Sequence, residues 1–301
     1  PHGPMFSDAI AVSYESNIHG DLGKFGAPGV SQSSNINLPL TEKIIEYSKE
    51  QNILTGKITT RSAHKYGMEY ELDHGALVPL YFVNKKYPNY KLVHITYGML
   101  SKMELYKFGM CIKKAVSEVN TKAVFIASGD LSHRLTKDGP YAYSPYGEKF
   151  DREITSLLEK GDVLKIFNMD KETVSEAGQC GLRSYYIMLG AMDGCDIKGK
   201  ILSYEGPFGV GYGVMNFSLK DDGRDTYSRL TEERQKIIAG KRKTEDPYVK
   251  LARESLTSYL VYHRYLENAD YLTDEMKNNK RGVFVSMKKE GQLRGCIGTI
   301  F

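Results

Sequence analysis

Ala123-Val124-Phe125-Ile126-Ala127-Ser128-Gly129-Asp130-Leu131-Ser132-His133 is the stretch that decides the expected fold class. Its first five residues are all apolar, which predicts a strand buried on both faces of a sheet that helices cover. Ligands of such sheets bind at the carboxyl ends of the strands, so Asp130 and His133 stand where chemistry is expected. Taken alone, the stretch equally fits a turn capped by Asp130 with His133 on the surface.

The sequence on either side of this stretch alternates between strand and helix patterns. Strands are expected over 8–14, 91–96, 200–204 and 211–219, and helices over 40–51, 76–83, 101–119, 144–160 and 182–192. Residues 19–29 are rich in Gly and Pro and predict a long loop, while 53–73 are ambiguous. This alternation predicts an α/β fold with a mainly parallel or mixed central sheet flanked by helices.

Composition excludes several classes of protein. The chain has 301 residues, of which 41% are hydrophobic, so it can bury a large core. It contains no apolar run long enough for a transmembrane helix and no signal-peptide pattern, and we expect a cytoplasmic protein with no membrane partner. The net charge is +4 with acids and bases interspersed, which indicates no nucleic-acid footprint. Four scattered cysteines predict reduced thiols rather than a disulfide framework.

The last quarter of the sequence differs in composition. Residues 221–245 are charged and poor in apolar side chains, which predicts a linker or a solvated helix between domains. Residues 246–301 predict one helix, beginning at Asp246-Pro247, and two strands joined near 289–291. So small a core favours a truncated α+β domain. The opening Pro1-His2-Gly3-Pro4, which lies inside a motif-like turn, likewise suggests a fragment of a longer protein.

Four side chains at expected loop or strand ends are candidates for chemistry: His2, His74, His133 and Cys180. Imidazole and thiolate together suit Zn²⁺, Fe²⁺ or copper, and three protein ligands leave a position open for water or substrate. Cys180 precedes an expected helix, whose dipole favours a negatively charged thiolate. The spacing matches no local metal signature, and each residue taken singly is explained as well by a capped turn, a hydrogen-bonded histidine or a buried thiol.

Four ordered motifs resemble a known family. Pro1–Asp8, Leu72–Leu80, Ser128–His133 and Ala177–Gly181 together look like the catalytic subunits of class III extradiol ring-cleavage dioxygenases (LigB-like) and their Memo-like branch. The resemblance spans residues 1 to about 220, and implies an α/β domain over 1–220 whose N-terminal strand, with a first ligand histidine, would precede Pro1.

A second resemblance concerns residues 246–301. This part looks like the beginning of an AMMECR-type domain, whose hallmark is the run Arg294-Gly295-Cys296-Ile297-Gly298. The two domains in this order resemble proteins of the AmmeMemoRadiSam system, which implies a radical-SAM protein as partner. Cys296 beside Arg294 is either a reactive thiol or part of a tightly packed strand.

The first resemblance also implies roles for individual residues. His2 and Cys180 match metal ligands, and His133 matches the acid/base histidine that takes a catechol proton. His74 matches a histidine on the substrate side of the pocket, and Asp130 matches a polar residue near the metal. The implied metal is Fe(II), with Zn(II) or copper as alternatives.

The resemblance leaves three functions open. Ring-cleaving members have a glutamate as third ligand, where this chain has Cys180; Glu176 stands about one helical turn earlier. The leading expectation is a non-haem Fe(II) extradiol dioxygenase that acts on a small aromatic diol with O₂ or performs a related redox step. The cysteine favours the alternative, a Memo-like protein that binds metal without ring cleavage and works with a radical-SAM enzyme. The third is a scaffold without metal.

Overall fold

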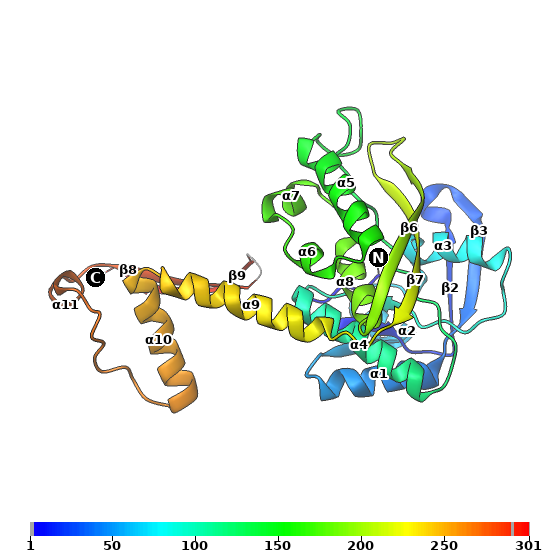
Figure 1. Ribbon diagram of the computed structural model, residues 1–301. Helices are drawn as coiled ribbons and strands as arrows, with labels where there is room; N and C mark the ends of the chain where they lie inside the picture. The colour runs from blue at the N-terminus through cyan, green and yellow to red at the C-terminus, as the bar shows by residue number, and fades with distance from the viewer. Residues whose placement is uncertain (1–2, 290–291, 301) are drawn as a thin grey trace. The chain divides into compact units, whose positions relative to one another are not determined.

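Three short strands form the central sheet of the protein, for which a computed structural model describes residues 3–289 and 292–300 (Figure 1). Strand β1 (Ile10–Ser13) lies between β4 (Thr55–Ile58), to which it is parallel, and β5 (Ile95–Thr96), to which it is antiparallel. Every residue of β1 is buried, because side chains cover both faces of the sheet. The expected α/β fold with a mixed sheet is therefore confirmed.

Contacts within the chain divide it into two compact units, Pro1–Leu230 and Thr231–Phe301. Besides the central sheet, the first unit has two antiparallel hairpins, β2 (Asn17–Leu22) with β3 (Ala27–Asn35) and β6 (Cys195–Glu205) with β7 (Tyr212–Asp221). A single 3₁₀ turn, η1 (Gly23–Phe25), joins β2 to β3. The helices of this unit are α1 (Leu38–Glu50), α2 (Thr60–Lys65), α3 (His74–Asn84), α4 (Lys102–Glu118), α5 (Pro145–Lys160), α6 (Val163–Phe167), α7 (Lys171–Glu176) and α8 (Leu182–Ala191).

Helix ends follow the local signals of the sequence. The Ser101 hydroxyl accepts a hydrogen bond from the Glu104 amide at the start of α4, while the Glu104 carboxylate accepts one from the Ser101 amide. Ser144 caps α5 with Pro145 at its first position, and Gly161 ends it in the left-handed conformation. These local contacts need no tertiary partner, which is why the sequence predicts them.

The prediction of a doubly buried strand over 123–127 is wrong. In the described chain this segment pairs with no other strand, and Val124 is 90% exposed. Only Phe125 and Ala127 pack against the core. The apolar character of a segment does not show whether one or both of its faces are buried. Burial depends on which other helices and strands pack against the segment.

Residues 19–29 were expected to form a loop, and most of them lie instead in the hairpin β2–β3. Gly20 allows this, since a Cβ there would lie 2.3 Å from the Leu72 carbonyl oxygen. The ambiguous residues 53–73 contain β4 and α2, and the strand expected over 91–96 shortens to Ile95–Thr96. Pro79 lies inside α3 rather than in its first turn.

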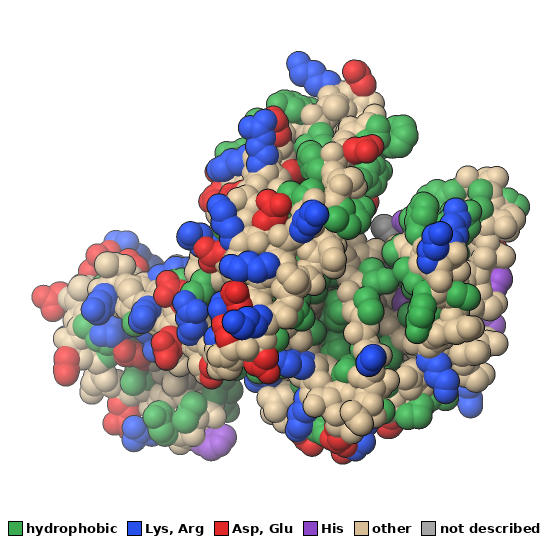
Figure 2. Space-filling model, turned by 45° about the vertical axis from the view of Figure 1, so that its right-hand side comes forward, with side chains coloured by type: hydrophobic (Ala, Val, Ile, Leu, Met, Phe, Trp, Pro, Cys, Tyr) green, Lys and Arg blue, Asp and Glu red, His purple; other side chains and the backbone are tan. Residues whose placement is uncertain are grey.

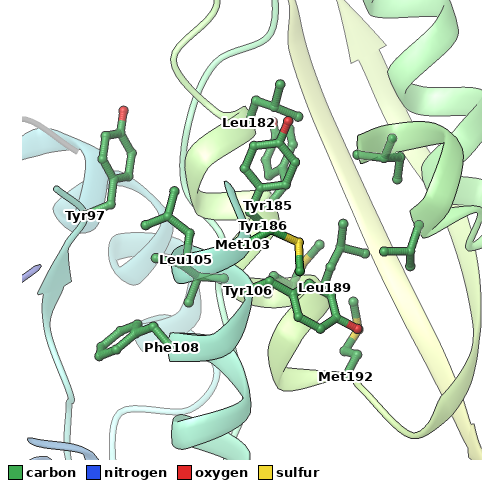
Figure 3. Packing of buried hydrophobic residues seen from close by; sticks show 14 of the residues in the cluster. Tyr97, Met103, Leu105, Tyr106, Phe108, Leu182, Tyr185, Tyr186, Leu189 and Met192 are labelled. Carbon is green, nitrogen blue, oxygen red and sulfur yellow. The ribbon is translucent and has the colours of Figure 1, made fainter. Parts of the chain in front are cut away.

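The core of the first unit centres on the crossing of α4 and α8 (Figure 3). Gly109 and Gly190 bring the two backbones together: a Cβ on Gly190 would lie 1.9 Å from the Tyr106 carbonyl oxygen, and one on Gly109 2.0 Å from that of Ile187. Tyr106, Phe108 and Leu189 are fully buried around this crossing. The close approach orients α8, and so places the residues that precede it.

The second unit contains α10 (Pro247–Tyr262), α11 (Asp274–Asn278) and the antiparallel hairpin of β8 (Val283–Lys289) and β9 (Gln292–Thr299). Asp246 caps α10, as its sequence predicts. The charged residues 221–245 contain helix α9 (Thr226–Lys243), which agrees with the solvated-helix alternative. No helix in the described chain combines the length and apolar character that crossing a membrane requires.

We expect Gly190→Ala to lower the free energy of unfolding by about 1–3 kcal/mol, because the added methyl group forces α4 and α8 apart. Urea unfolding followed by circular dichroism measures this change. The matched control is Gly29→Ala, where the methyl group meets open space and the stability stays within about 1 kcal/mol. Equal stability of the two variants would contradict the close crossing.

Candidate metal centre

Asp130, His133 and Cys180 come together where the 128–133 loop meets the turn before α8. One ligand atom from each residue lies within 4.8 Å of the other two. His133 Nε2 lies 3.5 Å from Asp130 Oδ2. The cluster therefore unites an imidazole, a carboxylate and a thiol that are separated by up to 50 positions in the sequence.

Backbone hydrogen bonds hold the two segments against each other. The Asp130 amide donates to Cys180 Sγ at 3.2 Å, and the Cys180 and Gly181 amides donate to the Asp130 carbonyl at 3.4 and 3.0 Å. A Cβ on Gly129 would lie 2.3 Å from Gly181 Cα, so the contact requires glycine. The position of the thiol is thus set by main-chain contacts rather than by a flexible side chain alone.

Two tyrosines support the same junction. The Tyr185 hydroxyl donates to the Gly129 carbonyl at 3.1 Å, and the Tyr97 hydroxyl donates to the Cys180 carbonyl at 2.9 Å. Burial raises the pKa of Tyr97 to about 12, so it stays a proton donor. Both segments are therefore tied to the hydrophobic core, where Tyr97 and Tyr185 lie (Figure 3).

A buried carboxylate lies beneath the loop. Asp151 on α5 is 1% exposed, and its two oxygens accept the Ser132 amide and the Tyr204 hydroxyl, each at 2.8 Å. Burial raises the pKa of Asp151. Because Ser132 precedes His133, Asp151 fixes the backbone from which the imidazole projects.

The electrostatics of the cluster favour a positive charge. The Asp130 carboxylate, and after it the Cys180 thiol, raise the pKa of His133 from 6.5 to about 9. His133 Nε2 is buried, and it has no hydrogen-bond partner in the described structure. The Asp130 carboxylate and the Cys180 thiol are donors that fit a divalent transition-metal ion, and His133 Nε2 lies beside them.

The other expected site residues lie apart from this cluster or outside the described chain. His2, an expected metal ligand, falls outside the described residues. His74 begins α3 and packs edge-on against Phe25, with ring centroids 4.8 Å apart; it is not a member of the cluster. The Glu176 carboxylate forms an ion pair with Arg134 at 3.0 Å and is not among the residues of the cluster.

His94 lies in the strand pattern of residues 91–96, which predicts no function for it. In the structure its Nδ1 lies 2.8 Å from Ser13 Oγ and its Nε2 lies 3.5 Å from Asp73 Oδ2, with all three residues at most 9% exposed. Asp73 also caps α3 by accepting the Gly75 amide. The sequence feature that could have indicated these contacts is a histidine between the apolar residues Val93 and Ile95. A polar side chain that is buried needs a hydrogen-bond partner.

The fold and this donor set define an α/β protein with a candidate metal centre. The chain belongs to the family of the catalytic LigB subunit of aromatic ring-opening dioxygenase, which matches residues 1–215. The AMMECR1 family matches residues 249–301. The expected resemblances to these two families are thereby confirmed.

Individual relatives agree with this family. A protein of Clostridium acetobutylicum is 53% identical over all of this chain, which spans 64% of that relative's length. A MEMO1 family protein of Methanococcoides burtonii is 27% identical over 71% of this chain and 80% of its own. The 3,4-dihydroxyphenylacetate 2,3-dioxygenase of Escherichia coli is 25% identical over 55% of this chain and 66% of its own.

We expect Asp151→Ala to cost roughly 2–4 kcal/mol of unfolding free energy, because the buried Ser132 amide and the partly exposed Tyr204 hydroxyl lose their acceptor. The control on the same helix is Glu148→Ala, which removes an exposed ion pair with Arg152 and should cost less than about 1 kcal/mol. Chemical denaturation measures both. A cost for Asp151→Ala no larger than that of the control would contradict the buried anchor.

The raised pKa of His133 predicts a pH dependence of stability in chelator-treated protein. The native state keeps the proton up to a pH of about 9 and the unfolded chain only to about 6.5, so this contribution is complete below 6.5 and disappears as the pH rises through 9. The unfolding free energy of the wild type relative to His133→Gln should therefore fall over that interval. A flat or rising difference in thermal-melt series would contradict the assigned environment.

Proposed function

We propose that the intact protein is a non-haem Fe(II) extradiol dioxygenase-like protein, which acts on an aromatic diol with O₂ or performs a related redox step. The observation that carries the proposal is the convergence of Asp130, His133 and Cys180 within 4.8 Å. Family membership over residues 1–215 supports it, and so does the named activity of the Escherichia coli relative.

His133 serves as the acid/base group in this proposal. Its Nε2 lies 3.5 Å from the Asp130 carboxylate, which stabilises the protonated imidazole, so the side chain can hold a proton beside the substrate and exchange it with a substrate hydroxyl. Cys180 supplies a thiolate ligand, with His2 as a second ligand by the family resemblance. Fe(II), when bound, supplies the chemistry that holds the diol oxygens and activates O₂.

His74 is assigned to the substrate side of the pocket. It occupies the first position of α3, and Asp73 fixes the start of that helix by accepting the Gly75 amide at 2.8 Å. The ring contact with Phe25, at a centroid distance of 4.8 Å, restricts the His74 side chain, so a hydrogen bond from it to a bound oxygen costs less conformational entropy.

A Memo-like protein that binds metal without ring cleavage is the second candidate. The observation that favours it is the cysteine at position 180, since the softer thiolate also suits Zn(II) or copper. Arg134 holds Glu176, the carboxylate about one helical turn before Cys180 in the sequence, in an ion pair. The AMMECR1 match and the MEMO1 family relative support a role beside a radical-SAM protein.

Metal analysis and oxygen uptake on the full-length protein, purified without oxygen, test the proposal. His133→Gln should lower uptake with a panel of catechols by roughly 10²–10⁴-fold while the metal content stays unchanged, because only the proton transfer is lost. The matched control is His64→Gln, a histidine exposed on α2, which should leave both quantities unchanged.

Cys180 variants separate the two candidates. Cys180→Ser should lower the metal content, whereas Cys180→Glu should retain Fe(II) and favour ring cleavage. A wild-type protein that binds metal but takes up no oxygen with any catechol would contradict the dioxygenase and leave the Memo-like function. Equal loss of metal and activity in His133→Gln would contradict the acid/base role.

A further inference from the structure

An exposed tyrosine covers one face of the site histidine. The Tyr141 and His133 rings are stacked, with centroids 5.1 Å apart and planes inclined by 21°. Tyr141 is 53% exposed, whereas the His133 side chain is 18% exposed. Tyr141 is therefore not held by burial in the core, and its described ring contact is with His133.

The loop that carries Tyr141 is anchored at both ends. The Leu135 amide donates to the Gly209 carbonyl, and the Ser144 amide donates to the Arg134 carbonyl, both at 3.0 Å. Arg134 Nε donates to the carbonyl of Ala142 at 2.7 Å. Because Ala142 follows Tyr141, this clamp limits where the ring can lie.

A second partly exposed tyrosine stands near the same cluster. Tyr212, at the start of β7, is 40% exposed. It follows Gly211, whose carbonyl accepts the Leu131 amide at 2.9 Å and whose amide donates to the Ser132 carbonyl at 2.7 Å, so Tyr212 lies next to the loop that carries Asp130 and His133. Figure 2 shows hydrophobic side chains around a hollow on one face of the protein, with Lys/Arg and Asp/Glu side chains interspersed over the surface. Two partly exposed aromatic side chains, Tyr141 and Tyr212, are thus associated with the loop that carries the cluster.

We infer that Tyr141 is a specificity-determining residue, which selects planar aromatic ligands at the Asp130–His133–Cys180 cluster by offering its ring beside His133. This inference rests on the proposed function, because it assumes that a ligand with aromatic hydroxyl groups binds there. Aromatic pairs favour offset or edge-on contacts at centroid distances of about 4.5–7 Å, so a ring presented to His133 also meets Tyr141. Ligands without a ring gain nothing from this contact.

Binding of 4-nitrocatechol to metal-loaded protein, measured without oxygen by absorption, tests the inference independently of turnover. Tyr141→Ala should weaken binding by about 3- to 10-fold, while Tyr141→Phe, which keeps the ring, should bind as the wild type does. Tyr143→Ala is the matched control, since Tyr143 lies in the same loop and is 48% exposed. Acetohydroxamate, a chelator without an aromatic ring, should bind all variants equally.

Chemical modification of His133 by diethyl pyrocarbonate, mapped by peptide mass, gives a readout that needs no metal. Tyr141→Ala should be modified several-fold faster than the wild type, because the covering ring is gone, and Tyr143→Ala at the wild-type rate. Thermal melts show whether each variant is folded.

Several results would overturn the inference: an unchanged modification rate, an unchanged affinity for 4-nitrocatechol, no binding of 4-nitrocatechol by the wild type, or an equal loss of acetohydroxamate binding. If the aromatic selection holds while no catechol supports oxygen uptake, the dioxygenase proposal fails and the inference stands.

Discussion

The contact between the Asp130 main chain and the Cys180–Gly181 turn is the constraint on which the candidate site depends. The Asp130 amide and carbonyl both engage this turn, so one peptide segment sets the thiol, the carboxylate and, three residues later, the imidazole. Glycine is required at 129, where a Cβ would lie 2.3 Å from Gly181 Cα, and at 181, where a Cβ would lie 2.4 Å from the Tyr185 hydroxyl oxygen. The crossing of α4 and α8 supports this contact, because it orients α8, the helix that follows the turn.

Two buried aspartates extend the same principle to the rest of the site. Asp151 holds the loop at Ser132, and Asp73 holds the start of α3 while lying 3.5 Å from His94. Burying a carboxylate costs free energy unless hydrogen bonds compensate it, and in both cases backbone amides do so. Asp151 and Asp73 are thus fixed by the core, and each one holds in place the backbone that carries a site histidine.

The cysteine at position 180 determines which metal ions the candidate centre can accept. A thiolate beside an imidazole and a carboxylate accepts a wider range of metals than a carboxylate in its place would. Glu176, the carboxylate about one helical turn before Cys180 in the sequence, forms an ion pair with Arg134. Arg134 also donates a hydrogen bond to the loop that carries Tyr141. The guanidinium group of Arg134 therefore contacts both Glu176 and the loop that places Tyr141 over His133.

The sequence by itself determined the helix ends, the α/β class and the motifs that contain Asp130, His133 and Cys180, because caps, periodicity and turn residues act over a few positions. It could not determine that residues 123–127 lie outside the sheet with Val124 exposed, or that 19–29 pair as a hairpin. It also missed the Ser13–His94–Asp73 contacts and the stacking of Tyr141 on His133. These features were decided by tertiary structure alone, since burial and contact depend on which distant segments the folded chain brings together.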